Sequence, residues 1–142
     1  MAGNKVKVSP EQLEAAVKDA VSKYISGVTL GVNESVTKVA KATKKKIVAD
    51  SPVRAGPVKP RGRKGQINRR YKKDWIITKE EGLFARSETI SNRQYRITHL
   101  LEDGHALRQG GRTRAQPHIR KHREAAIREF QELCEEVIKD GR

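Results

Sequence analysis

The chain has 142 residues, of which 35% are hydrophobic, 34% are charged and 4% are aromatic. This length suits a single domain, 1–142, with flexible ends at 1–8 and 139–142. The one cysteine, Cys134, excludes an intrachain disulfide and favours a reducing compartment. Because the first residues lack a secretory signal and no stretch approaches about 20 apolar residues, we expect a soluble protein without a membrane span.

The excess positive charge lies in two segments. The chain has 31 Lys and Arg residues against 17 Asp and Glu residues, which gives a net charge of +14. Residues 54–73 hold nine basic residues and residues 105–123 hold six, and neither segment contains an acid. These fifteen leave 16 basic residues against 17 acids, so the rest of the chain is close to neutral. Such segments favour a polyanion or an acidic protein surface as partner, with a solvated loop as the simpler alternative.

The first fifty residues show helical periodicity. Ser9 as N-cap, Pro10 at the first helical position and Gln12 in a capping box predict a helix start. Apolar residues with helical spacing follow at Leu13, Ala16, Val17, Ala20, Val21, Tyr24, Val28, Val32, Val36, Ala40 and Ile47. We predict two helices, or one long helix bent near Gly27–Gly31, ending before Pro52. The apolar stripe is interpreted as core.

Residues 51–73 predict a long basic loop or arm, because Pro and Gly recur in it and no regular element fits. With nine like charges and little apolar surface, residues 54–73 should be disordered in the isolated subunit and become ordered on assembly. Tyr71 lies in the arm with Trp75 just beyond it, so aromatic side chains for base stacking are few. The residues predicted to bind a partner, either protein or DNA, are Arg54, Lys59, Arg61, Arg63, Lys64, Arg69, Arg70, Lys72, Lys73, Arg108, Arg112 and Arg114.

The second half of the chain predicts strands followed by a helix. Two strand candidates, 74–79 and about 83–90, are separated by a hairpin turn at Glu81-Gly82. Residues 95–101 predict a third strand or a short helix that Gly104 stops. Pro117 predicts the start of an amphipathic C-terminal helix. This order predicts an α+β fold in which N-terminal helices and a C-terminal helix pack on a small antiparallel β-sheet.

All four histidines lie between residues 99 and 122, which raises the question of a metal or nuclease site. His118 and His122 have the spacing of paired zinc ligands, but a second ligand pair is missing and the stretch is rich in basic residues. A His-Asn-His nuclease centre needs an orienting asparagine, and none occurs after Asn92. P-loop and Gly-x-Ser-x-Gly motifs are also missing. We therefore expect no catalytic residue, no cofactor and no metal.

Two sequence motifs resemble those of a known family. DSPVRAG at residues 50–56 follows the N-terminal helix, and YRITHLLEDGH at residues 95–105 is followed by GGR and PHI before the last helix. In this order they resemble the two signatures of the tail-component family of siphophages and related prophages, also called neck or tail-completion proteins. The resemblance covers roughly residues 9–139. The chain departs from the family at Pro57–Lys73, where a basic segment precedes the expected strand.

The resemblance implies a virion protein without enzymatic activity, assembled in the host cytoplasm. It implies a ring of identical subunits, six-fold like the tail, between the head connector and the tail tube. Connector, tail-terminator and tail-tube proteins would be its partners, and genomic DNA would pass through the ring. A basic nucleic-acid-binding module is the alternative, and a metal-dependent nuclease is a minor one. The motif residues that would serve as structural scaffold are Ser51, Pro52, Gly56, His99, Glu102, Gly104, His105, Pro117 and His118.

Overall fold

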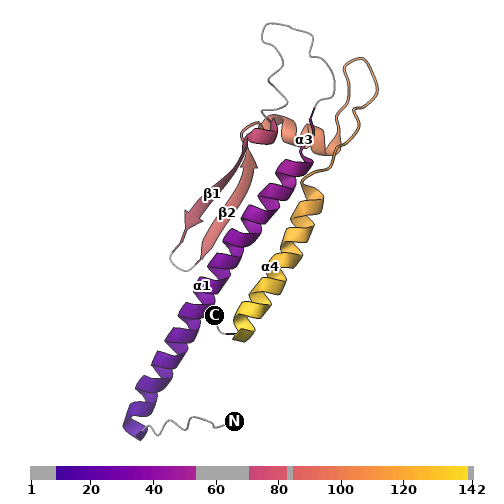
Figure 1. Ribbon diagram of the computed structural model, residues 1–142. Coiled ribbons are helices and arrows are strands. Elements are labelled where there is room, and N and C mark those ends of the chain that lie inside the picture. Colours follow the sequence, from indigo (N-terminus) through magenta and orange to yellow (C-terminus); the bar gives the residue numbers. More distant parts are fainter. Residues whose placement is uncertain (1–8, 54–70, 83–84, 141–142) are drawn as a thin grey trace.

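The computed structural model describes residues 9–53, 71–82 and 85–140. Its elements are α1 (Pro10–Asp50), β1 (Trp75–Glu81), β2 (Arg86–Asn92), α3 (Tyr95–Asp103) and α4 (Arg120–Asp140). The strands and α4 lie along the C-terminal half of α1, and α3 crosses near its end (Figure 1). The predicted α+β class, with helices packed on a small antiparallel sheet, is confirmed.

The N-terminal region is one continuous helix of 41 residues, which decides between the two predicted arrangements. At 1.5 Å per residue, α1 is roughly 60 Å long. Ser9 occupies the N-cap position, although its side chain makes no capping hydrogen bond within the described residues. The helix ends at Asp50 as predicted, because Pro52 disfavours helical backbone at Ser51, which is extended with φ −57° and ψ 129°.

The predicted hairpin is present, with shifted ends. β1 and β2 pair in antiparallel register from Trp75 opposite Asn92 to Glu81 opposite Arg86. The predicted turn at Glu81-Gly82 is therefore wrong by one residue, since Glu81 still pairs and the turn begins at Gly82. β2 also begins and ends later than predicted. The sheet contacts α1 through Thr37, whose hydroxyl donates to a Glu88 carboxylate oxygen over 2.6 Å.

Residues 95–103 form the short helix α3 rather than a strand, and Gly104 ends it with φ 69°. The predicted start of the last helix at Pro117 is wrong, because α4 begins at Arg120. Residues 113–118 have no regular secondary structure, and the Gln116 N–H donates to the Leu101 carbonyl of α3 over 2.8 Å. The predicted flexible end, 139–142, is wrong for Lys139 and Asp140, which belong to α4, and its last two residues lie outside the described ranges, as does the predicted flexible start, 1–8.

The hydrophobic core lies at the C-terminal end of α1. Ile47, Tyr71 and Trp75 are buried there, and partly buried side chains from the sheet, α3 and the start of α4 pack around them. The prediction of an arm through Lys73 is wrong at its end, because residues 71–73 form a helical turn and Tyr71 is only 1% exposed. Its burial shows that the last residues of the predicted arm belong to the core.

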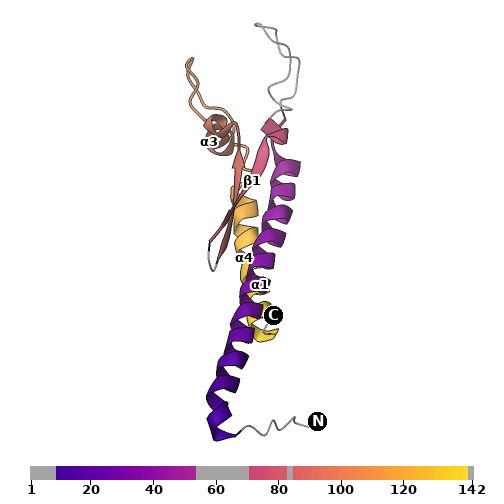
Figure 2. The same cartoon turned by 90° about the vertical axis from the view of Figure 1, so that its left-hand side faces the viewer.

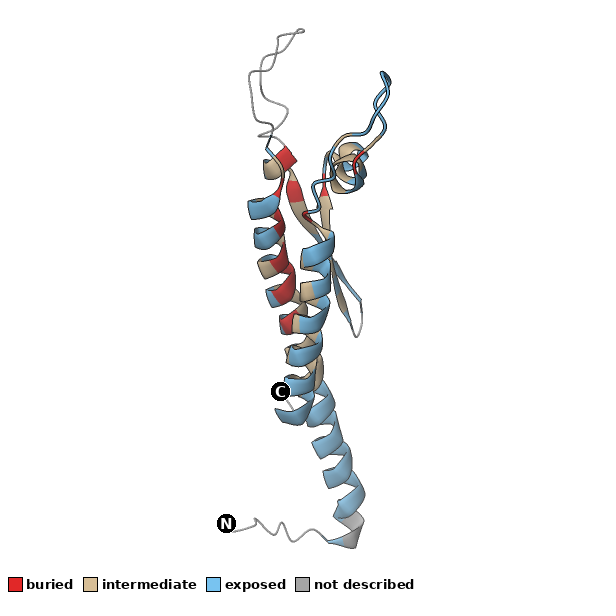
Figure 3. Ribbon diagram, turned by 90° about the vertical axis from the view of Figure 1, so that its right-hand side faces the viewer, coloured by how far each residue is buried: buried red, intermediate tan, exposed pale blue. Residues whose placement is uncertain are grey.

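The N-terminal half of α1 projects beyond the rest of the fold (Figure 3). The predicted core position of its stripe is wrong, since Leu13, Val17 and Val21 are at least half exposed. α4 runs beside α1 only as far as Tyr24, whose hydroxyl donates to the Ile138 carbonyl over 3.1 Å. Within the described ranges, residues 12–23 of α1 are left without a covering element.

This division of α1 predicts unequal effects of two similar truncations. Ile47→Ala removes a side chain that is 3% exposed and should lower the free energy of unfolding by about 2–5 kcal/mol. Leu13→Ala removes one that is 56% exposed and should change it by less than about 0.5 kcal/mol. Urea denaturation followed by circular dichroism measures both values. Equal losses would contradict the position assigned to the core.

Candidate partner-binding site

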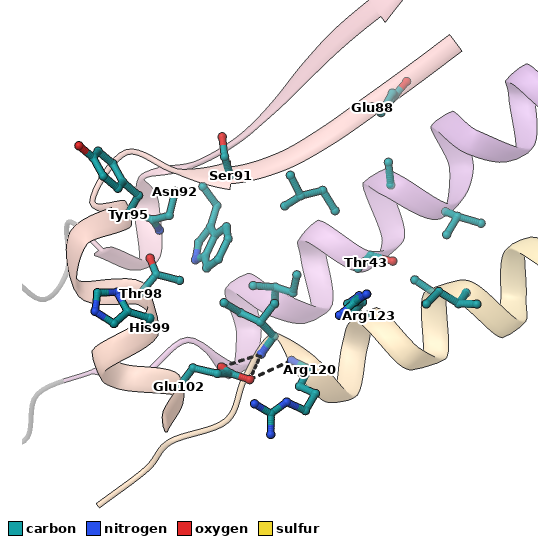
Figure 4. Close-up of a pocket in the computed structure, with 18 of the residues that line it drawn as sticks. Thr43, Glu88, Ser91, Asn92, Tyr95, Thr98, His99, Glu102, Arg120 and Arg123 are labelled. Carbon is teal, nitrogen blue, oxygen red and sulfur yellow. Dashed lines mark hydrogen bonds between the residues drawn. The ribbon is translucent and has the colours of Figure 1, made fainter. Parts of the chain in front are cut away.

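The start of α4 is held by a side chain from α3. The Glu102 carboxylate accepts from the backbone N–H groups of His118 at 2.9 Å, Ile119 at 3.1 Å and Arg120 at 2.9 Å. Figure 4 shows Glu102 beside Arg120 at the start of α4. The first N–H groups of a helix have no partner within it, and the helix dipole favours a negative charge there. Glu102 thus acts as a cap from a distant position in the sequence, which explains why α4 begins at Arg120 and not at Pro117.

His118 connects this cap to the core. Its ring is 1% exposed, with Nδ1 2.8 Å from the Gln116 carbonyl oxygen and Nε2 2.8 Å from the Tyr71 hydroxyl. Because a carbonyl oxygen only accepts, Nδ1 donates to Gln116, and in the neutral ring Nε2 then accepts from Tyr71. Nδ1 also lies 3.1 Å from Glu102. The rings of Tyr71, Trp75 and His118 meet edge to face, so the histidine is part of the core.

The residues flanking the basic arm are held by the same core. The Ser51 hydroxyl donates to the Ile47 carbonyl over 2.7 Å and accepts from the Trp75 indole over 2.8 Å. On the other side, the Asn92 amide donates to the Tyr71 carbonyl over 2.8 Å. The residues on both sides of the arm are therefore held by one buried cluster, which we call the rigid base and which consists of Ser51, Tyr71, Trp75, Asn92 and His118.

Residues 105–119 of the second basic segment form the loop between α3 and α4, and the last residues of the segment begin α4. The loop is closed by Thr113, whose N–H donates to the His105 carbonyl over 2.8 Å, and by a β-bridge between Ala106 and Arg112. A Cβ atom at Gly104 would lie 2.5 Å from the Thr113 carbonyl oxygen, so only glycine fits this turn. The loop projects at the end of the molecule where residues 51–53 and 71–73 lie (Figures 1 and 2).

The predicted partner-binding residues thus divide into two groups. Lys73, Arg108, Arg112 and Arg114 are exposed at this end, and Lys72 donates to the Ala49 carbonyl there over 3.1 Å. We call these exposed residues and their loops the basic end. The predicted residues that lie outside the described ranges are Gly56, Arg54, Lys59, Arg61, Arg63, Lys64, Arg69 and Arg70.

The remaining histidines occupy separate places. His122 bonds to Asp50 over 2.8 Å. The hydrogen bond from Lys121, and after it that from His122, lowers the pKa of Asp50. His105 Nδ1 lies 3.0 Å from the Thr113 hydroxyl, and His99 is exposed on α3. Among the described residues, no group of three or more His, Cys, Asp or Glu side chains is placed to hold a metal ion.

A groove of about 880 Å³ runs between α1, β2, α3 and the first half of α4. Apolar side chains supply most of its wall, and His99 and Glu102 lie at the α3 end (Figure 4). Two buried oxygens of its lining, Thr43 Oγ1 and Glu88 Oε2, have no hydrogen-bond partner among the described residues. The groove was not predicted, because its walls come from elements distant in the sequence.

The chain matches no family model, no curated protein and no solved structure. Among the described residues, no helix is both long and apolar enough to cross a membrane.

Replacing Glu102 should destabilise the protein far more than replacing its neighbour. Glu102→Ala leaves three N–H groups without their charged acceptor and should cost about 2–3 kcal/mol in unfolding free energy. Asp103→Ala removes only an exposed ion pair with Arg120 and should cost less than about 0.5 kcal/mol. Chemical denaturation of the two variants measures the difference. Similar losses would show that the cap does not hold α4.

The same carboxylate should make stability depend on pH. Burial alone would raise the pKa of Glu102, but the N–H donors of His118, Arg120 and Ile119 together lower it. A pKa lower in the folded state contributes stability above the unfolded pKa, about 4.3, that is lost as pH falls through the folded pKa. The Tm difference between the wild type and Glu102→Gln should therefore be largest at neutral pH and shrink below about pH 4. A constant difference from pH 7 to pH 3 would contradict this.

Proposed function

We propose that the protein is a structural component of the tailed-phage neck. In this role it is a tail-completion or head–tail joining protein that assembles as a ring between the head connector and the tail tube. The sequence motifs that resemble this family supply the starting point. The main support is spatial, because Ser51 of the first motif bonds to Trp75, whose ring packs against His118 of the second motif, and Glu102 of the second motif holds His118.

The proposed mechanism is docking by charge. Both flanks of the first basic segment, residues 51–53 and 71–73, lie at the same end of the molecule as the loop of the second. A neighbouring protein with an acidic surface would be attracted to this basic end, and complementary charge sets specificity and the rate of encounter. Identical subunits joined head to tail can close into a ring, as a neck component requires. This role needs no catalysis, cofactor or metal.

A nucleic-acid-binding module remains the second candidate, because the basic end would also attract phosphates. One observation weighs against base recognition. Tyr71 and Trp75, the aromatic residues in and beside the arm, are buried and cannot stack on bases. The exposed Arg108, Arg112 and Arg114 lie on one short loop, which suits contact with an acidic protein surface and with phosphates alike.

Removing charge from the described loop tests the docking role. The triple change Arg108→Ser, Arg112→Ser and Arg114→Ser should lower head–tail joining at least tenfold while leaving the melting temperature unchanged, since all three residues are exposed. The matched control, Lys41→Ser, Lys45→Ser and Arg128→Ser, removes the same charge from exposed helix positions elsewhere. Joining is measured by complementing a phage that lacks the protein. Normal joining by the loop variant would contradict the proposal.

DNA binding separates the two candidates. If the basic end only attracts phosphates incidentally, duplex DNA should bind weakly, without sequence preference, and should be released at physiological salt. Fluorescence anisotropy with labelled duplexes over a salt series measures this dependence. Tight binding with a clear sequence preference at physiological salt would instead favour the nucleic-acid-binding module.

A further inference from the structure

The N-terminal part of α1 carries an apolar face that the fold leaves uncovered. We define the α1 stripe as Leu13, Val17, Val21 and Tyr24, which are 47–56% exposed and lie on one side of the helix. Charged pairs occupy other faces, with Lys18 bonded to Glu14 and Lys23 bonded to Asp19. A helical segment of this length is only marginally stable in water without packing on its apolar face. Packing against a partner would therefore stabilise this part of the helix.

The groove is the matching feature on the same chain. Along α1 its wall runs from Val36 to Ile47, and along α4 it runs from Ile119 to Phe130. Each of these spans eleven residue steps, as does the α1 stripe from Leu13 to Tyr24, so all three are roughly 16 Å long. The groove is thus as long as the stripe that it would receive, and its wall is mostly apolar.

The stripe cannot enter the groove of its own chain. Both lie on one continuous helix, and Leu13 is roughly 35 Å from Val36 along its axis. The stripe and the groove wall also face directions roughly 100° apart around α1, at 100° per residue. In a two-fold dimer, the stripe and the groove of one chain would both have to face the α1 helix of the same partner. The angle of roughly 100° between the stripe and the groove wall opposes this arrangement. Head-to-tail contact between different copies meets no such conflict.

We propose that the α1 stripe of one copy of this chain docks in the groove of a second copy. A single contact along 16 Å of one helix buries less surface than the roughly 800 Å² per partner that is typical of a stable interface. Each copy, however, makes two contacts, one through its stripe and one through its groove. A closed ring satisfies every stripe and every groove, whereas a dimer leaves one of each open. The inference specifies the contact that would close the proposed neck ring, and its biological meaning rests on that proposal.

Two variants that each block one side of the contact provide the test. The double change Val17→Asp and Val21→Asp blocks the stripe, and Ile127→Asp, at a residue that lines the groove and is 48% exposed, blocks the groove. Ser22→Asp and Ser26→Asp, at exposed positions on the other side of α1, add the same two negative charges and serve as the charge control. Thermal melts confirm that each variant is folded.

Sedimentation velocity on the purified full chain gives the readout. The wild type and the control should form species larger than a dimer as the concentration rises to about 1 mM, the range of weak contacts. Each blocked variant alone should associate at least tenfold more weakly. Their mixture should form a complex of two chains and nothing larger, because one intact stripe then meets one intact groove.

Several results would overturn this inference. A wild type that stays monomeric at about 1 mM, including one whose stripe binds only some other protein, would exclude docking between copies. A wild type that stops at a dimer would exclude the head-to-tail arrangement. Normal self-association in a chain that plays no part in joining heads to tails would instead contradict the proposed function and leave this contact intact.

Discussion

Glu102 places one carboxylate against the first three N–H groups of the segment that enters α4, and most of the fold depends on this placement. The cap determines where α4 begins and joins that point to α3. It also positions His118 to bond with Tyr71, which closes the core against Trp75 and Ser51. Because a buried carboxylate is costly unless its hydrogen bonds are complete, this arrangement tolerates little change in backbone position.

The two ends of the molecule differ because this network is at only one of them. Near Glu102, the basic segments leave from a base that is held by buried side chains, so their charges start from fixed positions. At the other end, α1 extends past the last turn of α4 and keeps an apolar face in solvent. A subunit with charge at one end and exposed apolar surface at the other is suited to assembly, with the first providing specificity and the second packing.

Local patterns in the sequence predicted the elements better than their environments. The end of α1 before Pro52, the hairpin and the stop at Gly104 follow from neighbouring residues and were predictable. The burial of Tyr71 was not, because it depends on His118, 47 residues away. The stripe at Leu13 has the periodicity of core, and periodicity cannot tell whether another element covers it. The role of Glu102 as a cap for α4 likewise left no local signal.

Imaging of assembled particles tests the central claim most directly. If the protein is a neck component, a reconstruction of the virion should show a closed ring of this subunit between head connector and tail tube. The elongated α1 and the loop that carries Arg108 to Arg114 should be recognisable in each copy, with the loop against a neighbouring ring. Purified particles that lack the protein, or that hold it outside the neck, would contradict the claim.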